Sequence, residues 1–348
     1  MTAFTELIDL ASERLGGETV IANDEFFAPK ENLLKPGRGE WREHDYTDRG
    51  KWMDGWETRR RREPGNDWVI IRLGLPGIVR GVDVDTNHFK GNFPESCSID
   101  GACFDGPVSA EYLTGASAGP RIDWVQVLPK SRLHGHTQNL LPADIGERRL
   151  THVRLNIFPD GGVARFRVYG DVAPDWPALA RRNLSGELVD LAAIENGGYA
   201  VVCSDMFFGN RHNMLMPGRA PNMGDGWETR RRRGPGHDWC IIRLGRAGTI
   251  KRIEIDTNHF KGNYPDRCDI EGCNAARETP TNSLAGASWQ PLLPQTKLRA
   301  SERHFFDTAG NAPATFVRIN IYPDGGISRL RLFGDIADAA SLAQGQKR

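Results

Sequence analysis

The chain has 348 residues, of which 39% are hydrophobic and 26% are charged, and its 45 basic and 45 acidic side chains give a formal net charge of zero. This composition is typical of a globular protein and excludes a disordered one, and without a basic excess the chain is not expected to bind nucleic acid. No stretch approaches the roughly 20 apolar residues that cross a membrane, and six cysteines without CxxC spacing favour reduced thiols in a cytoplasmic protein over a disulfide scaffold or a zinc site.

The expected elements are mostly short strands separated by turns, because glycine (39) and proline (21) are frequent. The segments expected to be helical lie near Glu6, at 176–182 and near Glu187. The segments expected to be strands are 68–73, 79–86, 154–158, 163–169 and 250–257. A Pro-Asp-Gly-Gly turn between 154–158 and 163–169 predicts a hairpin. This pattern predicts an all-β protein.

Most of the sequence occurs twice. DGWETRRRR occupies 54–62 and again 225–233, and only three of the 21 residues that begin at each Asp differ between the copies. DTNHFKGN and R-x-N-I-x-PDGG then follow in the same order in both copies. A sequence that repeats itself over this length indicates a duplicated domain.

The duplication sets the predicted domain organisation. We predict one repeat at 1–180 and a second at 181–348, joined through a polar stretch with prolines, and a longer loop at 38–53 in the first copy. Each copy has an Asp-Gly-x-x-Thr stretch, an apolar strand that opens with Trp and ends in Leu-Gly, an alternating strand and a C-terminal hairpin. That order resembles the discoidin or galactose-binding-like jelly roll. The resemblance implies two tandem jelly-roll sandwiches with few short helices, and places the repeated motifs in loops at one end.

DTNHFKGN carries the candidates for proton transfer. Histidine exchanges protons near neutral pH, lysine supplies a cation, and the asparagine carboxamide is complementary to ureas and amides. The candidates are Asp85, Asn87, His88 and Lys90, with Asp256, Asn258, His259 and Lys261 in the second copy. In the structural alternative the asparagine caps a turn, the histidine is half-buried and the lysine is solvated. A single copy would favour the structural alternative, but these eight residues are unchanged in the second copy while the weaker segments of the two halves have diverged, which strengthens the functional interpretation.

The arginine run supplies the candidates for substrate binding. Alternate arginines of an extended chain point in opposite directions, so some of them could clamp a substrate carboxylate; the alternative is surface arginines paired with acids. The candidates are Arg59, Arg60 and Arg61, with Arg230, Arg231 and Arg232 in the second copy. Glu57 and Glu228 could orient these arginines, accept substrate N–H groups or act in catalysis. Trp56 and Trp227 are either pocket walls or core.

Other polar motifs are weaker. Asp160 and Asp324 lie in the PDGG segments, where turn geometry is the simpler explanation. His134 and His136 have no counterparts in the second copy, and a metal site there is the less favoured explanation. The sequence contains no GxSxG, phosphate loop or HExxH, so it predicts acid–base and electrostatic chemistry without a covalent intermediate.

The two copies of DGWETRRRR, of DTNHFKGN with a following cysteine, and of R-x-N-I-x-PDGG resemble the allantoicase family across both halves of the chain. The resemblance implies hydrolysis of allantoate to (S)-ureidoglycolate and urea in allantoin degradation, and two jelly-roll repeats. It also implies a homo-oligomer, trimeric or hexameric. The resemblance implies no certain cofactor, and Mn²⁺ is possible because manganese dependence has been suggested for some members of the family.

The residue inventory suits this reaction. The arginines supply a cation for the carboxylate of allantoate, and His88 is the first choice for proton transfer, with Lys90 stabilising charge. Elimination of urea followed by addition of water and direct displacement both remain open, as do one site within each repeat and one site shared by facing motifs. The alternatives are a non-catalytic tandem jelly-roll protein that binds carbohydrate or another small ligand, and a structural protein that assembles through its arginines.

Overall fold

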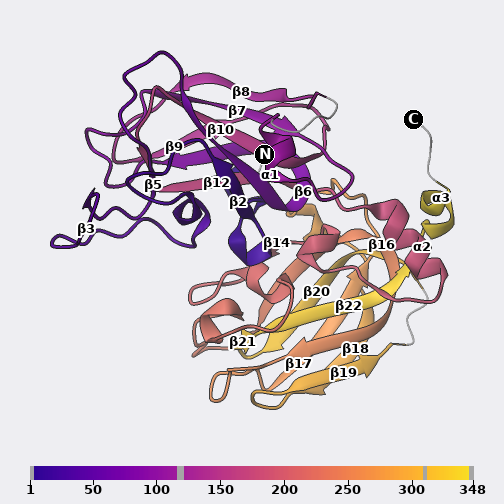
Figure 1. The fold of residues 1–348 in the computed structure, drawn as a ribbon. Coiled ribbons are helices and arrows are strands. Elements are labelled where there is room, and N and C mark those ends of the chain that lie inside the picture. The colour runs from indigo at the N-terminus through magenta and orange to yellow at the C-terminus, as the bar shows by residue number, and fades with distance from the viewer. Residues whose placement is uncertain (1–3, 116–120, 309–311, 345–348) are drawn as a thin grey trace. The chain divides into compact units, whose positions relative to one another are not determined.

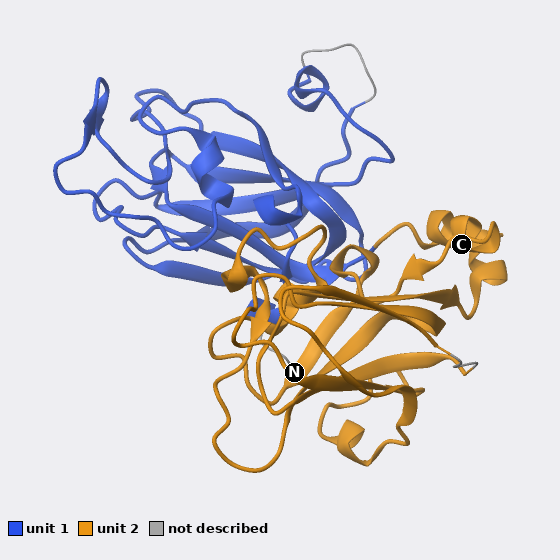
Figure 2. Cartoon of the chain, turned by 90° about the horizontal axis from the view of Figure 1, so that it is seen from below, with its two compact units in different colours: residues 1–173 blue, residues 174–348 orange. Residues whose placement is uncertain are grey.

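The computed structural model describes residues 4–115, 121–308 and 312–344. The chain divides into two compact units, residues 1–173 and 174–348 (Figure 2). The expected boundary at 180/181 falls inside helix α2 (Trp176–Leu184), which belongs to the second unit. Among the described residues, no helix is both long and apolar enough to span a membrane.

The first unit is almost entirely β (Figure 1). Its strands are β1 (Ile8–Asp9), β2 (Glu18–Ala22), β3 (Tyr46–Thr47), β4 (Gly50–Lys51), β5 (Trp56–Glu57), β6 (Asp67–Asp85), β7 (Ser96–Ala102), β8 (Val125–Arg132), β9 (Gln138–Pro142), β10 (Leu150–Phe158), β11 (Gly162–Val163) and β12 (Arg165–Val172). Its helical segments are α1 (Ala110–Leu113) and 3₁₀ turns at Phe4–Glu6, Glu13–Leu15 and Lys30–Leu34. The longer loop expected at 38–53 contains the β3–β4 ribbon.

The 19-residue strand β6 organises this unit. Its first half pairs with β2 and β10, its second half pairs with β9 and β12, and all four ladders are antiparallel. β6 therefore belongs to both layers of a sandwich, with β7 and β8 extending one layer and β1 the other. The strand changes layers at Gly74 and Gly77, where a Cβ would lie 2.6 Å from a backbone oxygen, so only glycine fits.

The second unit repeats this order. Its strands are β13 (Val189–Asp190), β14 (Tyr199–Cys203), β15 (Trp227–Glu228), β16 (Asp238–Asp256), β17 (Arg267–Cys273), β18 (Gln290–Lys297), β19 (Arg303–Asp307), β20 (Ala314–Tyr322), β21 (Gly326–Ile327) and β22 (Arg329–Ile336). Its helical segments are α2, α3 (Ala339–Ala343) and 3₁₀ turns at Ile194–Asn196, Arg211–Leu215, Met223–Asp225 and Ser283–Gly286. β16 takes the place of β6 and pairs with β14, β19, β20 and β22. The prediction of two tandem all-β repeats with few helices is confirmed.

Three local predictions are wrong: the PDGG hairpin and the helices near Glu6 and Glu187. The PDGG segment does not close a hairpin, because β10 pairs with β6 and β7 whereas β12 pairs with β1 and β6. The segment instead carries the chain between the layers, with β11 pairing with β5 on the way. The segment after Glu6 is not an α-helix, because the Asp9 carboxylate accepts the N–H groups of Ala11 and Val168 and ties this stretch to β12. The segment after Glu187 likewise forms β13 and a 3₁₀ turn, whereas the helix expected at 176–182 is present as α2.

Candidate functional site

A cavity of about 500 Å³ lies in the first unit, within the range of small-molecule sites of roughly 300–1,000 Å³. Five segments line it: Phe27 between β2 and the 3₁₀ turn Lys30–Leu34, β5 with the arginine run, the turn after β6, the end of β8 with the residues that follow, and the PDGG segment. The polar side chains on its wall include Glu57, Arg60, Asn92, Arg132, His134 and Asp160. Two of the predicted site residues, Glu57 and Arg60, are therefore brought together here.

Glu57 is the carboxyl group of this cavity whose titration is perturbed. It lies on β5, which is held by pairing with β11, and its side chain is half-buried. Burial raises the pKa of the Glu57 carboxyl above its usual value of 4.5, and a hydrogen bond from Asn92 Nδ2 to Glu57 Oε1, 2.6 Å long, partly offsets that rise. A raised pKa makes this carboxylate a stronger base than an ordinary glutamate.

The arginine run divides as an extended chain should. Arg59 pairs with Asp24 at 2.6 Å and Arg61 with Asp67 at 2.7 Å. Arg60 is exposed on the cavity wall, and within the described part of the chain it makes no hydrogen bond or ion pair. Arg60 is therefore the arginine of the run that is available to a ligand in this cavity, and Arg132, also exposed on the wall, is a second cation there.

The second unit divides its arginines in the same way. Arg230 pairs with Asp205 and Arg232 with Asp238, while Arg231 is exposed. The backbone N–H of the third arginine is also held in each unit, by Asp160 in the first and by Asp324 in the second. The two PDGG aspartates thus fix the end of each run.

The tryptophans of the repeated motif belong to the core. Trp56 and Trp227 are fully buried. Each indole N–H donates to a backbone carbonyl, that of Asp24 at 2.8 Å and that of Asp205 at 2.9 Å. Of the two interpretations left open by the sequence, the structure supports core packing, with the N–H satisfied as a buried indole requires.

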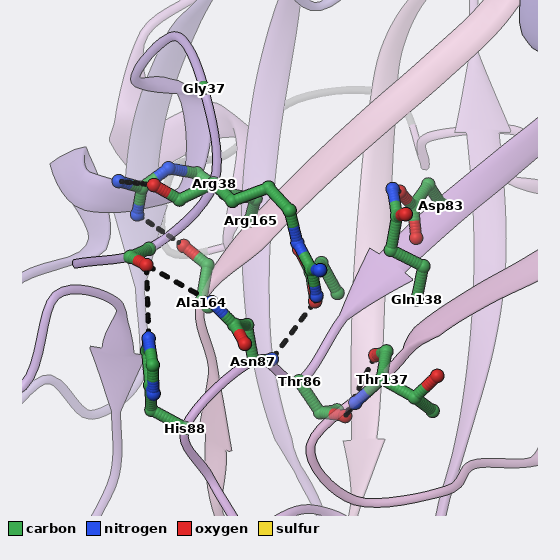
Figure 3. Close-up of polar contacts among 12 residues, drawn as sticks. Gly37, Arg38, Asp83, Thr86, Asn87, His88, Thr137, Gln138, Ala164 and Arg165 are labelled. Atoms are coloured by element: carbon green, nitrogen blue, oxygen red, sulfur yellow. Dashed lines mark hydrogen bonds and ion pairs between the residues drawn. The ribbon is translucent and has the colours of Figure 1, made fainter. Parts of the chain in front are cut away.

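The first residues of the DTNHFKGN motif face a different segment, the start of the 38–53 loop, whereas Gly91 and Asn92 at its end line the cavity. The Asp85 carboxylate accepts two hydrogen bonds from Arg38, at 3.0 and 3.1 Å, and one from the Asn87 N–H. Asn87 Nδ2 and His88 Nε2 both reach the Gly39 carbonyl, at 3.0 and 3.1 Å (Figure 3). None of the residues in these hydrogen bonds is among those that line the cavity.

The second copy of the motif is arranged similarly. His259 Nε2 lies 2.9 Å from the Ala220 carbonyl, and Asp256 accepts the Asn258 N–H and lies 3.9 Å from Arg219. His88 and His259 share left-handed backbone, with φ of 70° and 71°. The two lysines, Lys90 and Lys261, are exposed, and neither has a hydrogen bond or ion pair within the described residues.

Most cavity residues were absent from the site predicted by sequence, and three of them carry side chains used below: Asn92, Arg132 and His134. Asn92 ends the DTNHFKGN motif, and its identity in both copies was an available signal. His134 was considered only as a metal ligand. In the described residues no group of three or more His, Cys, Asp or Glu side chains is placed to hold a metal ion. The donor set of this cavity therefore does not fit Mn²⁺, and no step below is assigned to a metal.

Comparison with known proteins places this geometry in a family. The family model described as the allantoicase repeat matches residues 8–173 and 189–337. The chain belongs to the allantoicase family. It is 48% identical over 339 residues to a probable allantoicase 2 of Burkholderia pseudomallei, covering 96% of this chain and 97% of that one.

More distant members agree with this assignment. The chain is 43% identical to the allantoicase of Dictyostelium discoideum, over 96% of this chain and 89% of that one. The crystal structure of the Saccharomyces cerevisiae allantoicase matches with a TM-score of 0.76 at 34% identity, covering 94% of this chain and 92% of that one. The match across both repeats means that the whole fold is shared with the family.

Proposed function

We propose that this allantoicase family member hydrolyses allantoate to (S)-ureidoglycolate and urea in the cavity of its first unit. One observation carries the proposal. The cavity wall presents the unpaired guanidinium of Arg60 together with Glu57, whose carboxyl titrates above its usual range. An anionic diureide needs that combination, because a cation must hold its carboxylate and a base must take a proton from it.

The chemistry follows from these groups. Arg60 binds the carboxylate of allantoate and fixes the α-carbon near Glu57. Glu57 removes the N–H proton of the ureido arm that is retained, and that nitrogen forms a C=N bond to the α-carbon. The C–N bond to the other arm breaks, and its nitrogen takes a proton and leaves as urea. Water then adds across the C=N bond, with oxygen going to carbon and a proton to nitrogen, which gives ureidoglycolate.

The predicted roles of His88 and Lys90 stay predictions. The geometry supports a positioning role for His88, because its ring nitrogen is directed to the Gly39 carbonyl (Figure 3). A homo-oligomer, trimeric or hexameric, and a cytoplasmic location are further proposals that rest on the family resemblance. Light scattering of the purified chain tests the oligomer.

The activity is tested by incubating the purified chain with allantoate at pH 7–8, with and without added Mn²⁺, and measuring urea. We expect urea and ureidoglycolate in equal amounts. No urea under either condition rejects the proposal. Binding of glycans on an array without urea release would support the alternative, a jelly-roll module that only binds.

A further inference from the structure

Resting on the proposed function, we propose that the two repeats are not equivalent: the first repeat holds the reaction site, and His134 is the general acid that protonates the departing urea. The argument compares two copies of one fold within one chain. Where two matched backbone positions carry side chains of different chemistry, the difference shows which copy is able to perform the reaction.

The strand register matches the positions. Arg132 on β8 lies opposite Ser96 on β7, and Lys297 on β18 lies opposite Arg267 on β17. Two residues beyond each strand end stand His134 in the first unit and Arg299 in the second.

The backbones at these two positions are held identically. Thr86 Oγ1 donates to the His134 carbonyl at 2.6 Å, and Thr257 Oγ1 donates to the Arg299 carbonyl at 2.6 Å. The N–H of His134 is held by Asn139, and that of Arg299 by His304, at 2.8 and 2.9 Å. The scaffold is therefore the same, and only the side chain it presents differs.

The side chains have different chemistry. His134 lines the cavity, and within the described residues its ring makes no hydrogen bond. Arg299 is bound by Glu302 through two of its nitrogens. A guanidinium does not release a proton near neutral pH, whereas an imidazolium does. The second repeat thus has no proton donor at the position where the first has one.

The two glutamates differ in their surroundings. Glu57 is half-buried and lines the cavity, while the residue Glu228 is 9% exposed. In the second unit Asn263, the partner of Glu228, also lies 3.4 Å from the Met223 sulfur.

His134 completes the proton balance of the reaction. As the C–N bond breaks, the imidazolium gives its proton to the leaving nitrogen, while Glu57 takes the proton of the retained arm. In the second step neutral His134 takes a proton from the attacking water, and protonated Glu57 returns its proton to nitrogen. Both groups end in the states in which they began.

The experiment compares His134→Gln with the matched variant Arg299→Gln. We expect His134→Gln to lower kcat by about 10²–10⁴-fold, the usual contribution of general acid catalysis, and to flatten the alkaline limb of the kcat–pH profile. Arg299→Gln should stay within threefold of the unmodified chain. Circular dichroism and thermal unfolding check the fold of both variants.

The outcomes separate this inference from the proposed function. An unmodified chain that releases no urea refutes the function. If the unmodified chain is active and His134→Gln keeps its kcat, or lowers kcat without changing the shape of the pH profile, the role of His134 is overturned. An equal loss in Arg299→Gln overturns the inequivalence of the repeats.

Discussion

The hydroxyl of Thr86 offers a matched test of how the site is positioned. Thr86 is fully buried, donates to the carbonyls of His134 (2.6 Å) and Thr137 (3.0 Å), and accepts the Thr137 N–H at 3.2 Å. Thr86→Val removes all three hydrogen bonds. Both carbonyls keep another donor, Asn139 Nδ2 to His134 and the Thr86 N–H to Thr137, so the main cost is the Thr137 N–H, which is left without its acceptor.

One buried donor left without an acceptor costs about 1–3 kcal/mol. For a unit of this size that cost lowers Tm by about 2–12 °C. Thr257→Val removes the corresponding bonds in the second unit and should cost a similar amount. Activity should separate the two variants. A misplacement of about 1 Å at a reacting group lowers the rate by about 10²-fold, so Thr86→Val should lower kcat/KM by about 10–100-fold and Thr257→Val by less than threefold.

The assay is urea release well below both unfolding transitions, with Tm measured on the same samples. Comparable losses of Tm with a selective loss of kcat/KM in Thr86→Val support the reasoning. The reasoning is refuted if Thr86→Val loses stability but keeps kcat/KM, or if both variants lose kcat/KM equally.

Three further outcomes are expected. Arg60→Ala should raise KM for allantoate by about 10–100-fold, because a charged hydrogen bond contributes about 1.5–3 kcal/mol. The control is Arg62→Ala, which changes an exposed neighbour. An unchanged KM in Arg60→Ala contradicts carboxylate binding by Arg60. Glu57 acts as a base only when ionised, so kcat/KM should fall as pH drops through its raised pKa. Asn92→Ala removes the hydrogen bond that lowers this pKa and should move the acid limb of the kcat/KM–pH profile to higher pH by about one unit. An acid limb that moves to lower pH or does not move counts against Glu57. The double variant His88→Asn and His259→Asn should keep kcat within tenfold of the unmodified chain. Asparagine is chosen because it tolerates the left-handed backbone of both positions. A loss of kcat of about 10²–10⁴-fold with an intact fold would assign proton transfer to His88.

Most of the fold could be predicted from the sequence, because the repeats and the alternating strand patterns are visible in short stretches of sequence. The error at PDGG shows where such signals end. Turn residues between two alternating strands look the same whether those strands pair with each other or with opposite ends of a third strand. Here β10 and β12 both pair with the 19-residue strand β6, one with each half. The residues near the turn do not determine this pairing, because β6 lies far from them in the sequence.

The site was only partly readable. Glu57 and Arg60 were among the predicted residues because they belong to a repeated, charged motif. Which arginine stays unpaired depends on Asp24 and Asp67, which lie outside the run and reach it only in the folded unit. His134 carried no signal of this kind, since its importance arises from neighbours brought in by β5 and the turn after β6.

The residues that are identical in the two repeats therefore reflect the requirements of the fold more than those of catalysis. The matched tryptophans and the histidines of DTNHFKGN reach backbone carbonyls in both units, and Arg59 and Arg230 form matched ion pairs with Asp24 and Asp205. A duplicated fold must keep these groups in each copy to remain folded, whichever copy performs the reaction. Glu57 and Arg60 have identical counterparts in the second copy, Glu228 and Arg231, so identity alone does not show which copy performs the reaction. The positions at which the copies differ are the ones that can distinguish them. The pair His134 and Arg299, on identical backbone scaffolds with different proton chemistry, is such a position.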